Sequence, residues 1–247
     1  MKKILIAGAG ALGSGIGGML ACGEQHRVTF LGRAPHMDRI RDNGLRITGI
    51  WGEHLPRNIR PVTDPEQVSE IQDIVLVTCK SYSTPELLKA LRPVIGPETL
   101  VVSLQNGVGN EEVIQRNIPG KQTVGGMVII GFELECPGHV DVTVQADAVK
   151  LGWPDNAATA RIHSLAQIFS RAGIPCEPVD NIRAWLWAKV LYNSALNPLG
   201  AILQVPYNRL TAPHPWQIIE QVVSEAFTAL DAAGISTLWS TPEEYLK

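Results

Sequence analysis

Residues 2–22 read KKILIAGAGALGSGIGGMLAC. An apolar run is followed by Gly8, Gly10 and Gly13, which fit the pattern Gly-X-Gly-X-X-Gly. In such a loop the first glycine allows a tight turn, the second lets the backbone approach a pyrophosphate, and the third lets the next helix pack on the strand. We therefore predict a strand, a phosphate-binding loop and a helix whose free N–H groups face a dinucleotide.

Two other interpretations of this stretch carry less weight. A basic start, an apolar run and a small-residue end also occur in secretory signals. Six glycines between Gly8 and Gly18 argue against export, because each glycine costs a helix about 1 kcal/mol relative to alanine. A plain tight turn is the other alternative. No other segment reaches the roughly 20 apolar residues of a membrane helix. We expect a cytoplasmic protein, because the four separated cysteines are typical of free thiols in a reducing compartment.

The composition narrows the classes of partner. The chain has 247 residues, a formal net charge of −3 and four cysteines that are far apart in the sequence. No run of Lys and Arg indicates nucleic acid binding, and the spacing of Cys and His indicates neither a zinc site nor a disulfide framework. We expect a small-molecule partner, with no metal, no nucleic acid and no membrane. The sequence leaves a homodimer open.

Strand and helix patterns alternate along the first part of the chain. The run IVLV at 74–77 is continuously apolar, as in a parallel strand that is buried on both faces. Together with strand patterns at 26–33 and 99–104, it predicts βαβ units in an α/β, doubly wound, Rossmann-like sheet.

Two segments interrupt this alternation. Residues 45–54 and 57–63 resemble short strands separated by glycine, and we expect them to form an antiparallel pair. Residues 122–153 alternate apolar and polar positions between Gly and Pro, which favours a hairpin or meander at the edge of the sheet.

The pattern changes to long apolar helices after about residue 180. Residues 182–196 and 216–234 have helical spacing of apolar side chains. We predict a cofactor-binding domain over 1–180 and an all-helical substrate and catalytic domain over 181–247.

Three polar residues stand at regular spacing in the first of these helices. Residues 185–199 read WLWAKVLYNSALNPL, in which Lys189, Asn193 and Asn197 are four positions apart. On a helix they form one column on an otherwise apolar face. Desolvation there would lower the pKa of the lysine from about 10.4 toward neutrality, which suits an acid that protonates a developing alkoxide. The alternative is a snorkelling lysine.

The same segment contains a proline. Pro198 disfavours helical geometry in the residue before it. We therefore expect Asn197 at a helix end or a kink.

The end of the second strand indicates which dinucleotide binds. NAD-binding folds usually carry Asp or Glu about 20 residues after the glycine loop, but this chain has Gly32 and Arg33 there. A carboxylate would repel a 2′-phosphate, whereas a guanidinium can pair with it. We therefore expect NADPH, with a solvated surface arginine as the alternative.

Two polar residues follow the ends of later strands. Ligands of open α/β sheets bind beyond the carboxyl ends of the strands. Lys80 and Asn106 come directly after two such strands, so we expect them near the nicotinamide end of the cofactor. The alternatives are a solvated lysine and a simple Asn-Gly turn.

Together these motifs resemble the ketopantoate reductase (2-dehydropantoate 2-reductase) family along essentially the whole chain. The motifs are GAGALG at 8–13, TCK at 78–80, QNG at 105–107, PGHV at 137–140 and WLWAK with NPL at 185–199. The resemblance implies an oxidoreductase in which NADPH reduces the ketone of a 2-oxo acid. The family reaction converts ketopantoate to pantoate in pantothenate biosynthesis.

The resemblance also implies roles for individual residues. Lys189 matches the proton donor, Asn193 and Asn197 match substrate contacts, and Asn106 matches a residue near substrate and cofactor. The backbone at Gly131 is a weaker match to a cofactor contact. The residues expected to bind the cofactor are Gly8, Ala9, Gly10, Ala11, Leu12, Gly13, Arg33, Lys80, Asn106 and Gly131. Those expected to bind substrate are Lys80, Asn106, Asn193 and Asn197.

The chain departs from the family pattern in two places. The family carries a serine and a glutamate in a later helical segment, and no such motif precedes Lys247, so we expect an incomplete helical domain. Tyr207 falls on a family asparagine, with Asn208 one position beyond. Two alternatives therefore stay open: a reductase of another 2-oxo or β-hydroxy acid, and a non-catalytic NADPH-binding sensor or scaffold.

Overall fold

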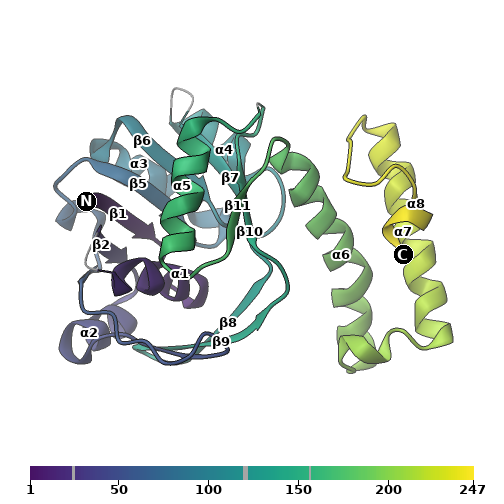
Figure 1. Cartoon of the computed structure of the whole chain (residues 1–247), viewed down its shortest axis with the longest axis horizontal. Helices are drawn as coiled ribbons and strands as arrows, with labels where there is room; N and C mark the ends of the chain where they lie inside the picture. Colours follow the sequence, from purple (N-terminus) through teal and green to yellow (C-terminus); the bar gives the residue numbers. More distant parts are fainter. Residues whose placement is uncertain (24–25, 119–121, 156) are drawn as a thin grey trace. The chain divides into compact units, whose positions relative to one another are not determined.

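The computed structural model describes residues 1–23, 26–118, 122–155 and 157–247. The chain divides into two compact units, Met1–Ile182 and Arg183–Lys247, both drawn in Figure 1. Each unit is described by itself.

Eight strands of the first unit form one sheet (Figure 1). They are β1 (Lys2–Ala7), β2 (His26–Leu31), β4 (Ile59–Val62), β5 (Gln72–Val77), β6 (Ile95–Ser103), β7 (Thr123–Met127), β10 (Val149–Gly152) and β11 (Cys176–Pro178). Their order across the sheet is β11-β10-β7-β6-β5-β1-β2-β4. All neighbouring strands are parallel except β7 and β10. The chain leaves β1 toward β4 and returns on the other side of β1 to β5, so the winding reverses there.

Helices cover both faces of this sheet. They are α1 (Ala11–Cys22), α2 (Ala34–Asn43), α3 (Thr84–Leu91), α4 (Asn110–Asn117) and α5 (Ala160–Arg171). Ile4 and Ile6 of β1 belong to the core that includes α1, α2 and α5, whereas Leu5 belongs to the core that includes α3 and α4. Because successive strand side chains point to opposite faces, an uninterrupted apolar strand is buried on both. The predicted doubly wound, Rossmann-like fold is confirmed.

A separate three-stranded sheet of the first unit packs against α1. It consists of β3 (Arg46–Gly49), β8 (Ile130–Cys136) and β9 (His139–Gln145), in the order β3-β9-β8. Gly15 of α1 lies directly against the ring of Phe132 in β8. A side chain at that glycine would separate the helix from this sheet.

The expected antiparallel pairing of 45–54 with 57–63 is wrong. Strand β3 pairs in parallel with β9, and β4 pairs in parallel with β2 at the edge of the main sheet. The physical reason is burial: Ile47 is fully buried in one core and Val62 is buried in the other. A short strand takes whichever partner covers its apolar side chain, and that partner lies far away in the sequence.

The expected hairpin or meander over 122–153 is only partly correct. Strands β8 and β9 form an antiparallel hairpin, but it lies outside the main sheet. Strand β7 is an interior strand, buried along its whole length between β6 and β10. Its glycines allow close packing, since a Cβ on Gly126 would lie 2.5 Å from Leu104.

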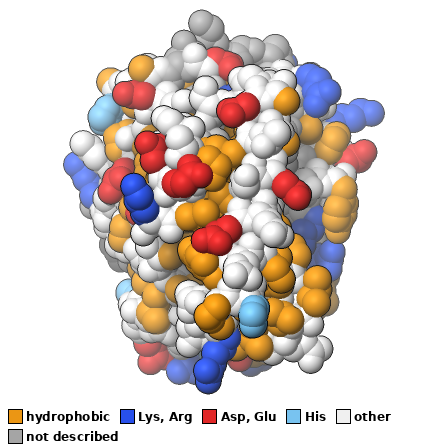
Figure 2. Space-filling model, turned by 90° about the vertical axis from the view of Figure 1, so that its right-hand side faces the viewer, with side chains coloured by type: hydrophobic (Ala, Val, Ile, Leu, Met, Phe, Trp, Pro, Cys, Tyr) orange, Lys and Arg blue, Asp and Glu red, His pale blue; other side chains and the backbone are white. Residues whose placement is uncertain are grey.

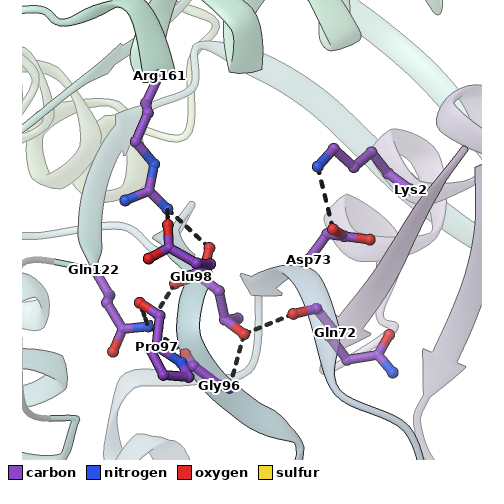
Figure 3. Close-up of polar contacts among 9 residues, drawn as sticks. Lys2, Gln72, Asp73, Gly96, Pro97, Glu98, Gln122 and Arg161 are labelled. Atoms are coloured by element: carbon purple, nitrogen blue, oxygen red, sulfur yellow. Dashed lines mark hydrogen bonds and ion pairs between the residues drawn. The ribbon is translucent and has the colours of Figure 1, made fainter.

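At the amino ends of β5 and β6, buried polar groups of the main sheet form hydrogen bonds with one another (Figure 3). The pairing of β5 with β6 shifts between Gln72 and Ile74, so residues 96–99 protrude from the ladder. Buried Thr99 accepts a hydrogen bond from Gly96 N (2.9 Å) and donates one to Gln72 O (2.6 Å). The buried Gln122 amide donates to the carbonyls of Gly96 and Thr99, at 2.5 and 3.0 Å. Two ion pairs, Lys2–Asp73 and Arg161–Glu98, flank this network (Figure 3).

Replacing Thr99 by valine is expected to lower the free energy of unfolding by about 1–3 kcal/mol. Valine preserves the shape of the side chain but leaves Gly96 N–H and Gln72 C=O without the hydroxyl that is their partner. Urea unfolding followed by circular dichroism measures the change. Exposed Thr143→Val in β9 is the matched control, with an expected change within about 0.5 kcal/mol. Equal effects of the two substitutions would contradict this account of the bulge.

The second unit consists of α6 (Ile182–Leu203), which begins one residue before it, α7 (Pro213–Ala232) and α8 (Pro242–Tyr245). Its core joins Leu191, Ala195 and Leu199 of α6 to apolar residues of α7. Among the described residues, none of the helices combines the length and hydropathy that a membrane crossing requires. Figure 2 shows apolar side chains at the surface on the side of α7, with acidic side chains among them.

The expected helix end at Asn197 is wrong, and the alternative expectation of a kink there stays a prediction. Helix α6 continues through Pro198 to Leu203. The apolar spacing of Leu191, Ala195 and Leu199 carries the buried face past the proline. Burial of this face offsets the roughly 3 kcal/mol that an interior proline costs.

Candidate functional site

Four loops leave the main sheet at its carboxyl edge. They follow β1 at Gly8, β2 at Gly32, β5 at Thr78 and β6 at Leu104. These strands are parallel neighbours in the order β6-β5-β1-β2, so their carboxyl ends meet at one edge. Four of the predicted site segments lie on these loops, namely the glycine loop, Arg33, Lys80 and Asn106.

The glycine loop is held by backbone bonds to the next strand. Gly8 N and Ala9 N both donate to Leu31 O, at 3.0 and 2.8 Å. Gly8 has a φ of +109°, and a Cβ there would lie 2.6 Å from the Cα atom of Cys79. Gly8 is therefore required by the fold itself, because both its backbone angle and its contact exclude a side chain.

Gly10 is a glycine for another reason. A Cβ there would have only Gly8 O within reach, at 4.0 Å. It is the N-cap of α1, and no side chain caps this helix end. The open approach to free N–H groups at a helix N-terminus suits a phosphate group. The loop and the first turn of α1 therefore fit a pyrophosphate.

Gln105 connects the loops that carry Lys80 and Asn106. Its side chain is 8% exposed, and its amide donates to Cys79 O and to Thr84 Oγ1, both at 2.8 Å. Lys80 and Asn106 each follow one of the joined residues and are exposed. The sequence motif QNG contains Gln105, but no local pattern assigned it a role, because its partners lie more than 20 residues away.

Arg33 lies beside the glycine loop. It is the exposed N-cap of α2, with an extended backbone. A Cβ on Gly32 would lie 3.2 Å from Ala9 O, so the two loops are in contact. The guanidinium can thus reach a group that is bound next to the glycine loop.

Gly131 belongs to another part of the first unit. It lies in β8 opposite Val144, and a Cβ there would lie 2.5 Å from Thr143 Oγ1. Its contacts are thus with β9 of the three-stranded sheet. Its role as a cofactor contact stays a prediction.

The column of polar residues lies on α6. Lys189 and Asn193 are half-buried, and Asn197 is exposed. Burial lowers the pKa of Lys189 to about 8. A lysine with this pKa holds a proton at neutral pH and releases it more readily than an ordinary lysine does.

Tyr207 contacts the last member of this column. Its hydroxyl donates a hydrogen bond to Asn197 Oδ1, and its ring meets Tyr192 edge to face at 6.0 Å. Tyr207 stands at the position where the family pattern has an asparagine. In this chain it orients the amide of Asn197.

Residues 4–156 match the family described as "Ketopantoate reductase PanE/ApbA", and residues 181–247 match its C-terminal part. The 2-dehydropantoate 2-reductase of Aquifex aeolicus is 35% identical over all of this chain and 78% of its own length. The chain spans 64% of the length of the 2-dehydropantoate 2-reductase of Pyrococcus horikoshii and 79% of that of Halobacterium salinarum.

Two solved structures extend the comparison. The 2-dehydropantoate 2-reductase of Geobacter metallireducens has a TM-score of 0.85 and 30% identity, over 99% of this chain and 81% of that one. D-mandelate dehydrogenase with NADH and anilino(oxo)acetate has a TM-score of 0.86 and 25% identity, over 99% of this chain and 77% of that one.

Proposed function

The chain belongs to the ketopantoate reductase family, and from this premise we propose that it reduces 2-dehydropantoate to pantoate with NADPH. The family that the motifs predicted is confirmed. The observation that carries the proposed reaction is that both units match relatives with this activity. A glycine loop alone would not identify this reaction, because many nucleotide-binding folds share such a loop.

We assign the cofactor to the first unit. The loop from Gly8 to Gly13 and the N-terminus of α1 would hold the pyrophosphate, and Arg33 would pair with the 2′-phosphate. Lys80 and Asn106 would lie near the nicotinamide. When bound, NADPH supplies the hydride. A cytoplasmic location, a homodimer and the division of roles at residue 180 stay predictions.

We assign proton transfer to the second unit. Hydride addition places negative charge on the carbonyl oxygen of the substrate, and the ammonium of Lys189 would stabilise that charge and donate a proton to the oxygen. Asn193 and Asn197 are neutral, so they can orient the carboxylate or hydroxyl of the substrate without forming an ion pair with the lysine. Tyr207 supports the proposal by holding the Asn197 amide.

Replacing Arg33 by aspartate is expected to raise KM for NADPH by about 10-fold to 100-fold and to leave KM for NADH unchanged or lower. The loss follows from a charge-assisted bond worth about 1.5–3 kcal/mol and from new repulsion of the 2′-phosphate. Arg27→Asp is the matched control, because Arg27 is an exposed arginine at the opposite end of β2. An NADPH preference that survives in Arg33→Asp would remove Arg33 from the cofactor site.

The reaction itself is tested by NADPH oxidation with 2-dehydropantoate and a panel of 2-oxo acids. The D-mandelate dehydrogenase match favours one alternative, a 2-oxo acid with an aromatic side chain, so 2-oxo-2-phenylacetate belongs in the panel. Highest kcat/KM for 2-dehydropantoate supports the proposal. Tight NADPH binding with no 2-oxo acid reduced would instead support the sensor or scaffold.

A further inference from the structure

A buried histidine joins three elements of the first unit. His36, in the first turn of α2, is 6% exposed. Its Nε2 atom lies 2.9 Å from Ser14 Oγ in α1. Its Nδ1 atom accepts a hydrogen bond from Gly138 N, also at 2.9 Å.

The backbone donor fixes the state of the ring. Because Gly138 N–H can only donate, Nδ1 must carry a lone pair. A neutral imidazole then carries its hydrogen on Nε2 and donates it to Ser14 Oγ. Burial lowers the pKa of His36, which favours this neutral form. Both ring nitrogens are therefore used, and the ring has one orientation.

The three segments that His36 joins are the first turn of α1 after the glycine loop, the first turn of α2 after Arg33, and the PGHV turn. Ser14 is in the first turn of α1, where its N–H bonds to Gly10 O of the glycine loop at 2.8 Å. His36 follows Arg33 by three residues, and its N–H donates to Arg33 O at 3.1 Å. Gly138, with a φ of +84°, belongs to the PGHV motif, which the reaction itself did not explain.

We propose that His36 is a positioning residue that holds the loop of Arg33 at a fixed distance from the glycine loop and thereby sets the preference for NADPH over NADH. The inference rests on the proposed role of Arg33. A guanidinium pairs with a phosphate in a narrow range of geometry, so its backbone must be fixed relative to the loop that holds the pyrophosphate. The His36–Ser14 bond links these two loops, and the PGHV turn supports the ring from the other side.

Three substitutions of His36 and one of Ser14 separate the effects of the two hydrogen bonds of the ring. His36→Gln can keep a donor near the position of Nε2, His36→Asn can keep an acceptor near that of Nδ1, and His36→Leu keeps neither. Ser14→Ala removes the partner of Nε2 and leaves the histidine in place. Dissociation constants for NADPH and NADH, measured by titration calorimetry, give a ratio within each variant that does not depend on the folded fraction.

We expect His36→Leu, His36→Asn and Ser14→Ala each to weaken NADPH binding by about tenfold, as for the loss of one buried hydrogen bond, with NADH binding unchanged. His36→Gln should retain most of the preference, and Ser14→Ala combined with His36→Asn should add nothing further. Two results would overturn the inference. One is an equal loss of affinity for NADPH and NADH. The other is an unchanged ratio of the two dissociation constants in Ser14→Ala and His36→Asn.

Arg33→Ala, measured in parallel, separates the two proposals. If Arg33→Ala abolishes the NADPH preference and the His36 and Ser14 variants keep it, the positioning role fails and the role of Arg33 stands. If Arg33→Ala keeps the preference, the role of Arg33 fails, and the positioning role fails with it. His36→Asn, His36→Gln and Ser14→Ala keep the test decisive if His36→Leu does not fold.

Discussion

Replacing Lys189 by alanine is expected to lower kcat for 2-dehydropantoate by about 10²-fold to 10⁴-fold, the usual contribution of a positioned general acid. The Kd for NADPH is expected to stay unchanged, because the glycine loop and Arg33 belong to the first unit. Single-turnover kinetics and a cofactor titration measure the two effects. An alanine variant with near-normal turnover would show that Lys189 is only a snorkelling side chain.

The pH dependence follows from the pKa of Lys189. Burial lowers it from 10.5 to about 8, and the acid form is the active one, so kcat for ketone reduction should fall as the pH rises through about 8. Lys189→Arg is the matched control: it keeps the positive charge but holds its proton across this range. It should therefore bind the 2-oxo acid, turn over slowly and show no decline near pH 8.

The lowered pKa of Lys189 also makes the stability of the protein depend on pH. Between about pH 8 and 10.5 the unfolded chain binds more protons at Lys189 than the folded chain does. The free energy of unfolding contributed by this group therefore rises with pH across that window. Below about pH 8 the folded protein carries the full cost of the buried charge. Comparing urea unfolding of the original chain and Lys189→Met at pH 7 and pH 10 checks the direction.

Replacing Gly8 by alanine is expected to destabilise the first unit by about 3 kcal/mol or more, whereas Gly10→Ala should leave its stability nearly unchanged. At Gly8 the methyl group would overlap backbone atoms of Cys79 at a φ of +109°, and both the overlap and the left-handed backbone cost energy. At Gly10 the methyl group would meet only Gly8 O at 4.0 Å.

Cofactor binding should give the complementary result for Gly10. The added methyl group would occupy the approach to the N-terminus of α1, so Gly10→Ala should weaken NADPH binding by about 10-fold to 100-fold while the protein stays folded. Thermal unfolding and calorimetric titration measure both properties in one preparation. A Gly10→Ala protein that binds NADPH normally would contradict the assignment of this loop to the pyrophosphate.

Local patterns were sufficient for much of the fold. The spacing of Gly8, Gly10 and Gly13 after an apolar run predicts the first strand, turn and helix, because a pyrophosphate-binding loop needs a tight turn, an open backbone approach and close helix packing at these three positions. Continuous apolar strands predict a parallel sheet with both faces covered. The spacing of Lys189, Asn193 and Asn197 places them on one helix face, since four residues are close to one turn.

Only the tertiary structure decided where distant segments meet. The sequence could not assign partners to β3 and β4, because a short strand pairs where its apolar side chain is buried. Nor could it show that α6 passes through Pro198, since packing with α7 overrides the local preference.

The sequence could not predict the roles of Gln105 and His36, because their hydrogen-bond partners are also far away along the chain. Gln105 bonds to a carbonyl 26 residues away, and His36 bonds to an N–H 102 residues away. A buried polar side chain is defined by the partner that satisfies it. That partner reaches it only when the chain has folded.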